Sequence, residues 1–206
     1  MTATRRARTP SAGMESALLD AAAEILESEG PDALSVRRIA AVAGVAPMGV
    51  YNHFDNKYGI VDALFISGFE RLRDSMAEAH RMEDPLAALR ESGQRYRALA
   101  LANPMMYQVM FLRAVAGFEP SVRALTVATG AFDALATTVQ RGIDAGVLAG
   151  PDAIMTAQVI WASIHGWMSL ELLGIGPVEA GAEGFDLVCA TALQGLHPNL
   201  VPGKRA

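Results

Sequence analysis

Two side chains near the N-terminal quarter of the chain could bind a polyanion. Tyr51 carries a hydroxyl that can donate a hydrogen bond to a phosphate and a ring that can pack beside a sugar. Lys57 precedes a long helix-forming segment, so we expect it at a helix N-terminus, where unpaired N–H groups and the helix dipole already attract an anion. Both residues predict contacts to a nucleic-acid backbone rather than covalent chemistry.

Composition alone does not predict nucleic-acid binding. The formal net charge is −5, and residues 1–60 hold six basic and seven acidic side chains. The distribution matters more than the total, because five of the acids lie in the first predicted helix. Most of the bases lie outside it: Arg5, Arg6, Arg8, Arg37, Arg38 and Lys57.

Other chemistry has little support in the sequence. Cys189 is the only cysteine, so no intramolecular disulfide can form, and no Cys/His spacing suggests a metal site. No clustered acids or activated nucleophile suggest catalysis, and we expect neither an enzyme nor a cofactor. The longest apolar run, Ile154 to Ile175, contains Gln158, His165 and Glu171, which are costly in lipid. We therefore expect a cytoplasmic protein that does not enter a membrane.

The first 54 residues show three helices in sequence. Apolar residues at helical spacing predict a helix over 11–29, which Gly30-Pro31 ends. Ser35 can cap a short helix over 36–43, and Pro47 can start another over 47–53. The last of these buries Val50 and Phe54 and exposes its other face. Two short helices joined by three or four residues, one of them Gly44, are typical of a helix-turn-helix.

Prolines divide the rest of the chain. A fourth helix, capped by Asp55 or Asn56, is expected to reach about residue 79, and five Pro-bounded segments follow it. The sequence predicts an all-α fold of about nine helices, with a three-helix head, a connecting helix and a helical body. We expect a basic arm over 1–13, a DNA-binding domain over 14–58, and a ligand-binding and dimerisation domain over 59–206.

The stretch Ser35 to Lys57 reads SVRRIAAVAGVAPMGVYNHFDNK. Its Gly44-Val45, Tyr51, His53-Phe54 and Lys57 closely resemble the DNA-binding signature of the TetR family of bacterial regulators. The resemblance implies that Tyr51, His53 and Lys57 contact the DNA backbone and that Arg37, and less directly Arg38, reaches DNA. Against this, His53 could be a capping residue and Lys57 a solvated charge. The predicted DNA-contacting residues are Arg37, Arg38, Pro47, Met48, Gly49, Tyr51, Asn52, His53 and Lys57.

The chain departs from the family pattern at two helix starts. Ala46 replaces the small hydroxyl residue that usually precedes Pro47, and Gly59 replaces the acid that would complete a capping box. Each change is expected to weaken a helix start by about 1 kcal/mol. Since Pro47, Met48 and Gly49 offer no side-chain donors, base recognition is expected to use Met48 on thymine methyls, Asn52, Arg37 and DNA shape.

The body contains Trp161-x3-His165-Gly166, which is similar to the C-terminal domain of the TetR subgroup named Trp-His-Gly. A glycine inside a helix costs about 1 kcal/mol, so we expect another helix to cross closely at Gly166. His165 is either a core histidine bonded to a neighbouring backbone or hydroxyl group, or a pocket residue.

Methionines and aromatic residues cluster in the middle of the body. The resemblance implies a small apolar or aromatic effector there, and flexible Met side chains suit variable ligands. Ordinary helix packing is the alternative for each of them. The predicted ligand-binding residues are Tyr96, Met105, Met106, Tyr107, Met110, Phe111, Trp161 and His165.

The apolar faces of 152–173 and 182–196 predict a homodimer, because one short recognition helix makes too few contacts for tight binding to DNA. The resemblance then implies a sequence-specific regulator: a repressor released from a palindromic double-stranded operator by a small apolar ligand. Two alternatives remain, a DNA-binding protein that answers to no small ligand and an all-α enzyme or carrier that merely contains a helix-turn-helix.

Overall fold

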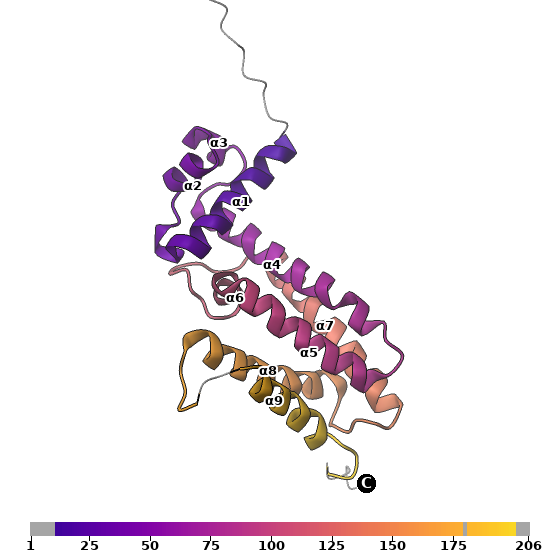
Figure 1. Ribbon diagram of the computed structural model, residues 1–206. Coiled ribbons are helices and arrows are strands. Elements are labelled where there is room, and N and C mark those ends of the chain that lie inside the picture. Colours follow the sequence, from indigo (N-terminus) through magenta and orange to yellow (C-terminus); the bar gives the residue numbers. More distant parts are fainter. Residues whose placement is uncertain (1–10, 179–180, 201–206) are drawn as a thin grey trace, which may run out of the picture. The chain divides into compact units, whose positions relative to one another are not determined.

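The computed structural model describes residues 11–178 and 181–200, and all of their regular structure is helical (Figure 1). The α-helices are α1 (Ser11–Glu29), α2 (Val36–Val42), α3 (Pro47–Tyr51), α4 (Lys57–His80), α5 (Pro85–Ala102), α6 (Pro104–Phe111), α7 (Val122–Asp144), α8 (Ala153–Leu173) and α9 (Ala182–Gly195). A short 3-10 helix, η1 (Pro31–Ala33), follows α1. The predicted all-α class with nine helices is confirmed for the described part of the chain.

Local sequence accounts for most helix ends. Ser35 accepts a hydrogen bond from the Arg38 N–H at the start of α2, as expected of its cap. Gly44 has φ 68°, a left-handed conformation that glycine adopts without steric cost, and it begins the turn into α3. Ala46 makes no side-chain cap bond, which agrees with the predicted departure from the family pattern. The third helix is shorter than expected, because it ends at Tyr51 rather than His53.

The described residues form two compact units that do not follow a single cut in the sequence. The first unit contains residues 11–68 and 105–124, and the second contains residues 69–104, 125–178 and 181–200. Helices α4 and α7 each contribute to both units. Compact units reflect packing rather than function, so the boundary expected between 58 and 59 remains a prediction about function.

The first unit buries the apolar faces that periodicity predicted in its helices. Leu18, Ile25, Ile39 and Val50 are fully buried, one or more from each of α1, α2 and α3. α2 packs against both α1 and α3, so the two short helices are held by a common core. Burying each such side chain contributes about 1.5–3 kcal/mol, which compensates for the low stability of short isolated helices.

The second unit has its own core. One cluster joins α5, α7, α8 and α9 with the loop before α8: Leu89, Ala136, Val139, Leu148, Ala157, Ile160 and Leu193. Arg141 of α7 donates hydrogen bonds to the carbonyls of His80, Met82 and Glu83, which end α4. This guanidinium therefore satisfies carbonyls that a helix terminus leaves without partners.

Candidate nucleic-acid interface

Helix α3 presents one buried and one exposed face. Val50 is fully buried, whereas the side chains of Met48 and Tyr51 are 66% and 52% exposed. Pro47 and Asn52 are also exposed, and Gly49 is half-buried. A recognition helix needs this arrangement, because the inward residue fixes the helix while the outward residues remain available to base edges.

Lys57 lies at the first position of α4. The side-chain oxygen of Asn56 accepts hydrogen bonds from the N–H groups of Tyr58 at 2.7 Å and Gly59 at 3.4 Å. Asn56 rather than Asp55 is therefore the cap of this helix. The Lys57 ammonium lies 5.1 Å from the centre of the Tyr58 ring, a cation–π distance that orients the lysine side chain.

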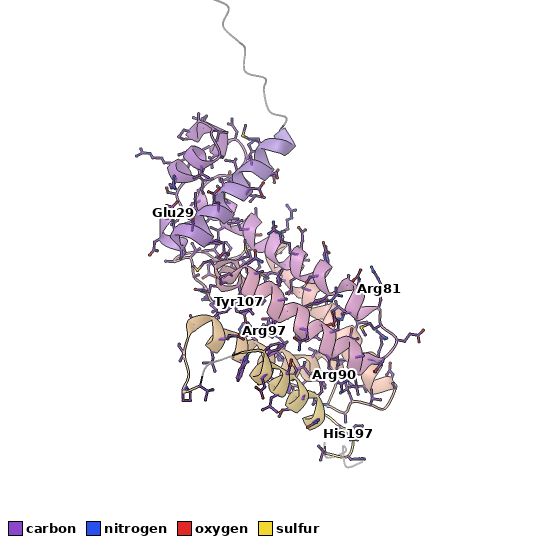
Figure 2. The ribbon with its side chains drawn as sticks, viewed as in Figure 1. Glu29, Arg81, Arg90, Arg97, Tyr107 and His197 are labelled. Carbon is purple, nitrogen blue, oxygen red and sulfur yellow. The ribbon has the colours of Figure 1, made fainter. Side chains whose placement is uncertain are left out.

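The two arginines of α2 differ in their surroundings. Arg37 is exposed. The guanidinium of Arg38 forms a fork-like ion pair with Glu29 at the end of α1, with Nε–Oε distances of 3.1 and 3.2 Å and an Nη2–Oε1 distance of 2.5 Å (Figure 2 labels Glu29). The side-chain hydrogen bonding between them raises the pKa of Arg38 and lowers the pKa of Glu29. Arg38 thus already has an anionic partner, whereas the sequence suggested only a DNA contact.

Three further polar residues tie the helix-turn-helix to the segment 105–124. Glu27 of α1 accepts hydrogen bonds from the N–H groups of Met105 and Met106. The Tyr58 hydroxyl donates to the carbonyl of Ala116, and the Asp62 carboxylate accepts from the N–H and hydroxyl of Ser121. Sequence reasoning missed all three, because their partners lie 58 to 79 residues away and leave no local pattern.

The eight predicted ligand-binding residues fall in both compact units. Met105, Met106, Tyr107, Met110 and Phe111 belong to the first, and Tyr96, Trp161 and His165 belong to the second. Most are buried and the rest are half-buried. Within the first unit, the rings of Tyr107 and Phe111 lie 4.9 Å apart.

In the second unit, His165 is bonded to a hydroxyl group. The Tyr96 hydroxyl shares a hydrogen bond with Nδ1 of His165 at 3.0 Å, and the Trp161 ring lies 5.0 Å from the imidazole. The Phe132 ring meets Trp161 edge-on at 6.2 Å. Burial lowers the pKa of His165, so the imidazole is neutral at pH 7. This matches the expectation of a histidine bonded to a neighbouring hydroxyl and leaves its role toward a ligand as a prediction.

Helices α5, α8 and α9 are joined by a largely buried ion pair. The Arg97 guanidinium donates two hydrogen bonds to the Glu171 carboxylate, and the two side chains are only 18% and 10% exposed (Figure 2 labels Arg97). Arg97 also lies over the Phe185 ring, 5.8 Å from its centre. Each charge is partnered, as burial requires.

The close helix crossing expected at Gly166 is wrong for the described residues of a single chain. A Cβ at Gly166 would meet no heavy atom within 4 Å among them, and Gly166 is exposed. The close approach occurs instead at Gly184 of α9, which packs against the Trp167 ring. The physical reason is the phase of α8: its residue 167, and not 166, faces α9.

Helix α8 leaves an apolar face exposed. Met155, Val159, Leu170 and Leu173 recur at helical spacing and are 44% to 53% exposed. Ala162 and Gly166 lie between them along the same face. Glu171, the only charged residue of α8, points away from this face into the ion pair with Arg97.

Two family models cover most of the chain. Residues 18–64 match "Bacterial regulatory proteins, tetR family", and residues 89–192 match "Tetracyclin repressor-like, C-terminal domain". The first match spans the helix-turn-helix, and the second spans half of the chain. The chain belongs to the TetR family.

Curated relatives agree with this membership. The TetR-family chain is 26% identical over 178 residues, 85% of its length and 78% of the relative's, to the uncharacterized HTH-type transcriptional regulator Rv0681 of Mycobacterium tuberculosis. It is 29% identical over 96 residues to the uncharacterized regulator YobS of Bacillus subtilis, and this match spans about half of each protein. The chain is thus a DNA-binding transcriptional regulator of the TetR type, and the expectation of a regulator rather than an enzyme is confirmed.

Solved structures share the fold. A protein of unknown function from Rhodococcus sp. RHA1 superimposes with a TM-score of 0.76 at 25% identity, covering 95% of this chain and all of that one. The TetR-family regulator PfmR of Thermus thermophilus gives 0.68 at 21% identity, covering 87% and 98%. The fatty acid degradation regulator FadR of Bacillus halodurans gives 0.73 at 19% identity, covering 88% and 99%. The matches confirm the TetR-type fold, and membership of the Trp-His-Gly subgroup stays a prediction.

Two further features of the described residues bear on membranes and metals. Among residues 11–178 and 181–200, no helix is both long and apolar enough to cross a bilayer. The same residues contain no group of three or more His, Cys, Asp or Glu side chains placed to hold a metal ion.

Proposed function

We propose that this TetR-family chain is a cytoplasmic, homodimeric repressor that leaves a palindromic operator when a small apolar or aromatic effector binds its body. The observation that carries the proposal is the exposed face of α3, where Met48, Tyr51 and Asn52 point outward while Val50 anchors the helix. Lys57 stands at the adjoining start of α4.

The proposed contacts divide into positioning and readout. Tyr51, His53 and Lys57 donate to phosphates, which fixes the helix in the major groove without reading sequence. Lys57 is supported in this role by the positive end of the helix dipole at the start of α4. Pro47 and Gly49 lack bulky polar side chains and let the helix backbone approach the DNA closely.

Base recognition falls to the remaining exposed residues. Met48 contacts a thymine methyl, Asn52 can pair with adenine through its amide, and Arg37 can pair with guanine. Arg38 reaches the DNA only if its guanidinium is shared with, or released from, Glu29. Its contribution to binding is therefore smaller than that of Arg37.

We assign the dimer to α8 and α9. The apolar face of α8 that includes Val159 and Leu173 carries no charge and would remain in water in a monomer. The small residues Ala162 and Gly166 allow a second α8 to approach this face closely. Two-fold symmetry would then present two recognition helices to the two halves of a palindrome.

The effector is assigned to the Met and aromatic side chains of the body and α6. They are apolar, largely buried and adaptable, which suits an apolar ligand of irregular shape. Release requires that the effector bind the DNA-free conformation better than the DNA-bound one, because equal affinity for both shifts nothing.

The test is selection of binding sites from random duplex DNA by the full chain, followed by a screen for compounds that release the selected duplex. The proposal expects an enriched site with two-fold symmetry and at least one apolar compound that lowers affinity for it. Enrichment of no sequence would refute the operator. If compounds that raise the melting temperature leave DNA binding unchanged, the effector part of the proposal fails.

A further inference from the structure

Helix α6 begins without a capping group of its own. Pro104 occupies its first position and has no N–H, so Met105 and Met106 supply the first amide donors that lack partners within the helix. The residue before it, Asn103, uses its side-chain NH₂ to donate to the Leu99 carbonyl at the end of α5. The amides at the start of α6 must therefore find an acceptor elsewhere.

Glu27 of α1 supplies that acceptor. Its Oε1 lies 3.0 Å from the Met106 nitrogen, and its Oε2 lies 3.3 Å from the Met105 nitrogen. A carboxylate at a helix N-terminus is also favoured by the helix dipole. Because each oxygen takes a different amide, the contact fixes both the distance and the orientation of α6 relative to α1.

We infer that Glu27 is a positioning residue of the helix-turn-helix, through which α6 and α1 move together. The inference rests on the proposed function for its effect on operator binding. Glu27 lies near the end of α1, which packs against α2 and thereby against the helix-turn-helix. A shift of α6 must either pull α1 with it or break the two hydrogen bonds.

Packing limits the freedom of α6 to slip past α4. A Cβ at Gly68 would lie 2.6 Å from Sδ of Met110, so α4 and α6 approach as closely as a missing side chain allows. The Phe118 ring, seven residues beyond α6, packs 6.1 Å from the ring of Phe65 on α4. Displacement of α6 therefore meets resistance at α4 and is transmitted to α1 through Glu27.

The chain path makes this contact a point of control. The segment 105–124 belongs to the same compact unit as the helix-turn-helix, but it is joined to the second unit at both of its ends. Coupling between two sites is reciprocal. If α6 biases the helix-turn-helix, then DNA bound to the helix-turn-helix must alter the amides of α6, and this can be measured without any effector.

The experiment is amide hydrogen exchange of the full chain, followed by mass spectrometry on peptides covering 104–111. Three proteins are compared, with and without a duplex selected from random DNA: the natural chain, Glu27→Ala and Glu15→Ala. Glu15 is exposed on the same helix, so its replacement removes the same charge without touching α6. Alanine preserves helix α1 in both variants.

In the natural chain and in Glu15→Ala, we expect the duplex to change exchange in 104–111 by about fivefold or more, the lower end of measured couplings. In free Glu27→Ala, exchange of the first-turn amides should be about tenfold faster, as for loss of a helix cap. The duplex should still bind Glu27→Ala but leave its exchange in 104–111 unchanged.

Two results overturn the inference: a duplex that binds the natural chain without changing exchange in 104–111, or a Glu27→Ala variant that keeps the full duplex-induced change. Failure of every variant to bind any duplex would instead refute the proposed function. In that case the exchange rates of the free proteins still decide whether Glu27 holds the start of α6. If Glu27→Ala unfolds, Glu27→Gln, which keeps one acceptor oxygen, should give an intermediate response.

Discussion

The approach of Gly184 to Trp167 leads to a sharp prediction. A Cβ at Gly184 would lie far inside van der Waals distance of the ring atoms Cη2 and Cζ2 of Trp167. The ring cannot easily give way, because its Nε1 is already buried, without a hydrogen-bond partner among the described residues. We expect Gly184→Ala to displace either the ring or α9.

The size of the effect follows from two terms. Overpacking by one methyl group in a filled site costs about 1–3 kcal/mol. Replacing glycine by alanine in a helix interior recovers about 0.5–1 kcal/mol, but Gly184 is in the first turn of α9 and should gain less. Gly184→Ala should therefore lower the free energy of unfolding by about 1–3 kcal/mol.

Gly130 offers a matched control. It lies in the interior of α7, and a Cβ there would meet no heavy atom within 4 Å in the described part of the chain. Gly130→Ala should therefore stabilise by up to about 1 kcal/mol. Urea unfolding of both variants at one protein concentration measures the difference. In a Trp161→Phe background, where Trp167 is the only tryptophan, fluorescence should also shift for Gly184→Ala. Equal stability of the two variants would refute the reasoning.

Three further predictions test other parts of the molecule. Val159→Asp places a charge on the exposed face of α8 and should convert a dimer into a monomer in sedimentation; an unchanged dimer would move the interface elsewhere. Lys57→Ala should weaken selected and random DNA alike and reduce the salt dependence by about one unit for each phosphate that the lysine of a subunit neutralises, whereas Met48→Ala should change base preference; the reverse pattern would contradict the proposed orientation of α3. Burial lowers the pKa values of His80 and His165, so the unfolded chain takes up protons first as the pH falls below about 6.5, and stability should be constant above this pH and decline below it. Unfolding midpoints between pH 8 and 5 measure this, and replacing both histidines by Gln should flatten the curve.

Much of the fold was predictable because its signals are local. Apolar spacing, prolines and glycines indicated the helices to within one or two residues at most ends, and Ser35 caps α2 as its sequence position suggests. The exposed face of α3 followed from the burial of Val50, since the two faces of so short a helix are fixed by one anchor. These features depend on neighbours within about four residues.

The relations that escaped prediction join distant segments. Glu27 is an ordinary acid on a helix surface until α6 is brought beside it, and Glu29 resembles a solvated charge until it meets Arg38. Gly166 and Gly184 are alike in sequence, but only the phase of α8 decides which of them faces a ring. Such partners depend on how helices pack, which periodicity does not specify.

The discontinuous make-up of the first compact unit bears on building chimaeric regulators. A head cut at residue 58 and grafted onto another body would carry Glu27 without the amides of Met105 and Met106. A cut at 68 would also separate Asp62 from Ser121. A transplantable sensor–operator module therefore requires two junction pairs, so that 105–124 travels with the N-terminal segment. Exchange of heads between family members by a single recombination event would leave these contacts to be rebuilt by later substitutions.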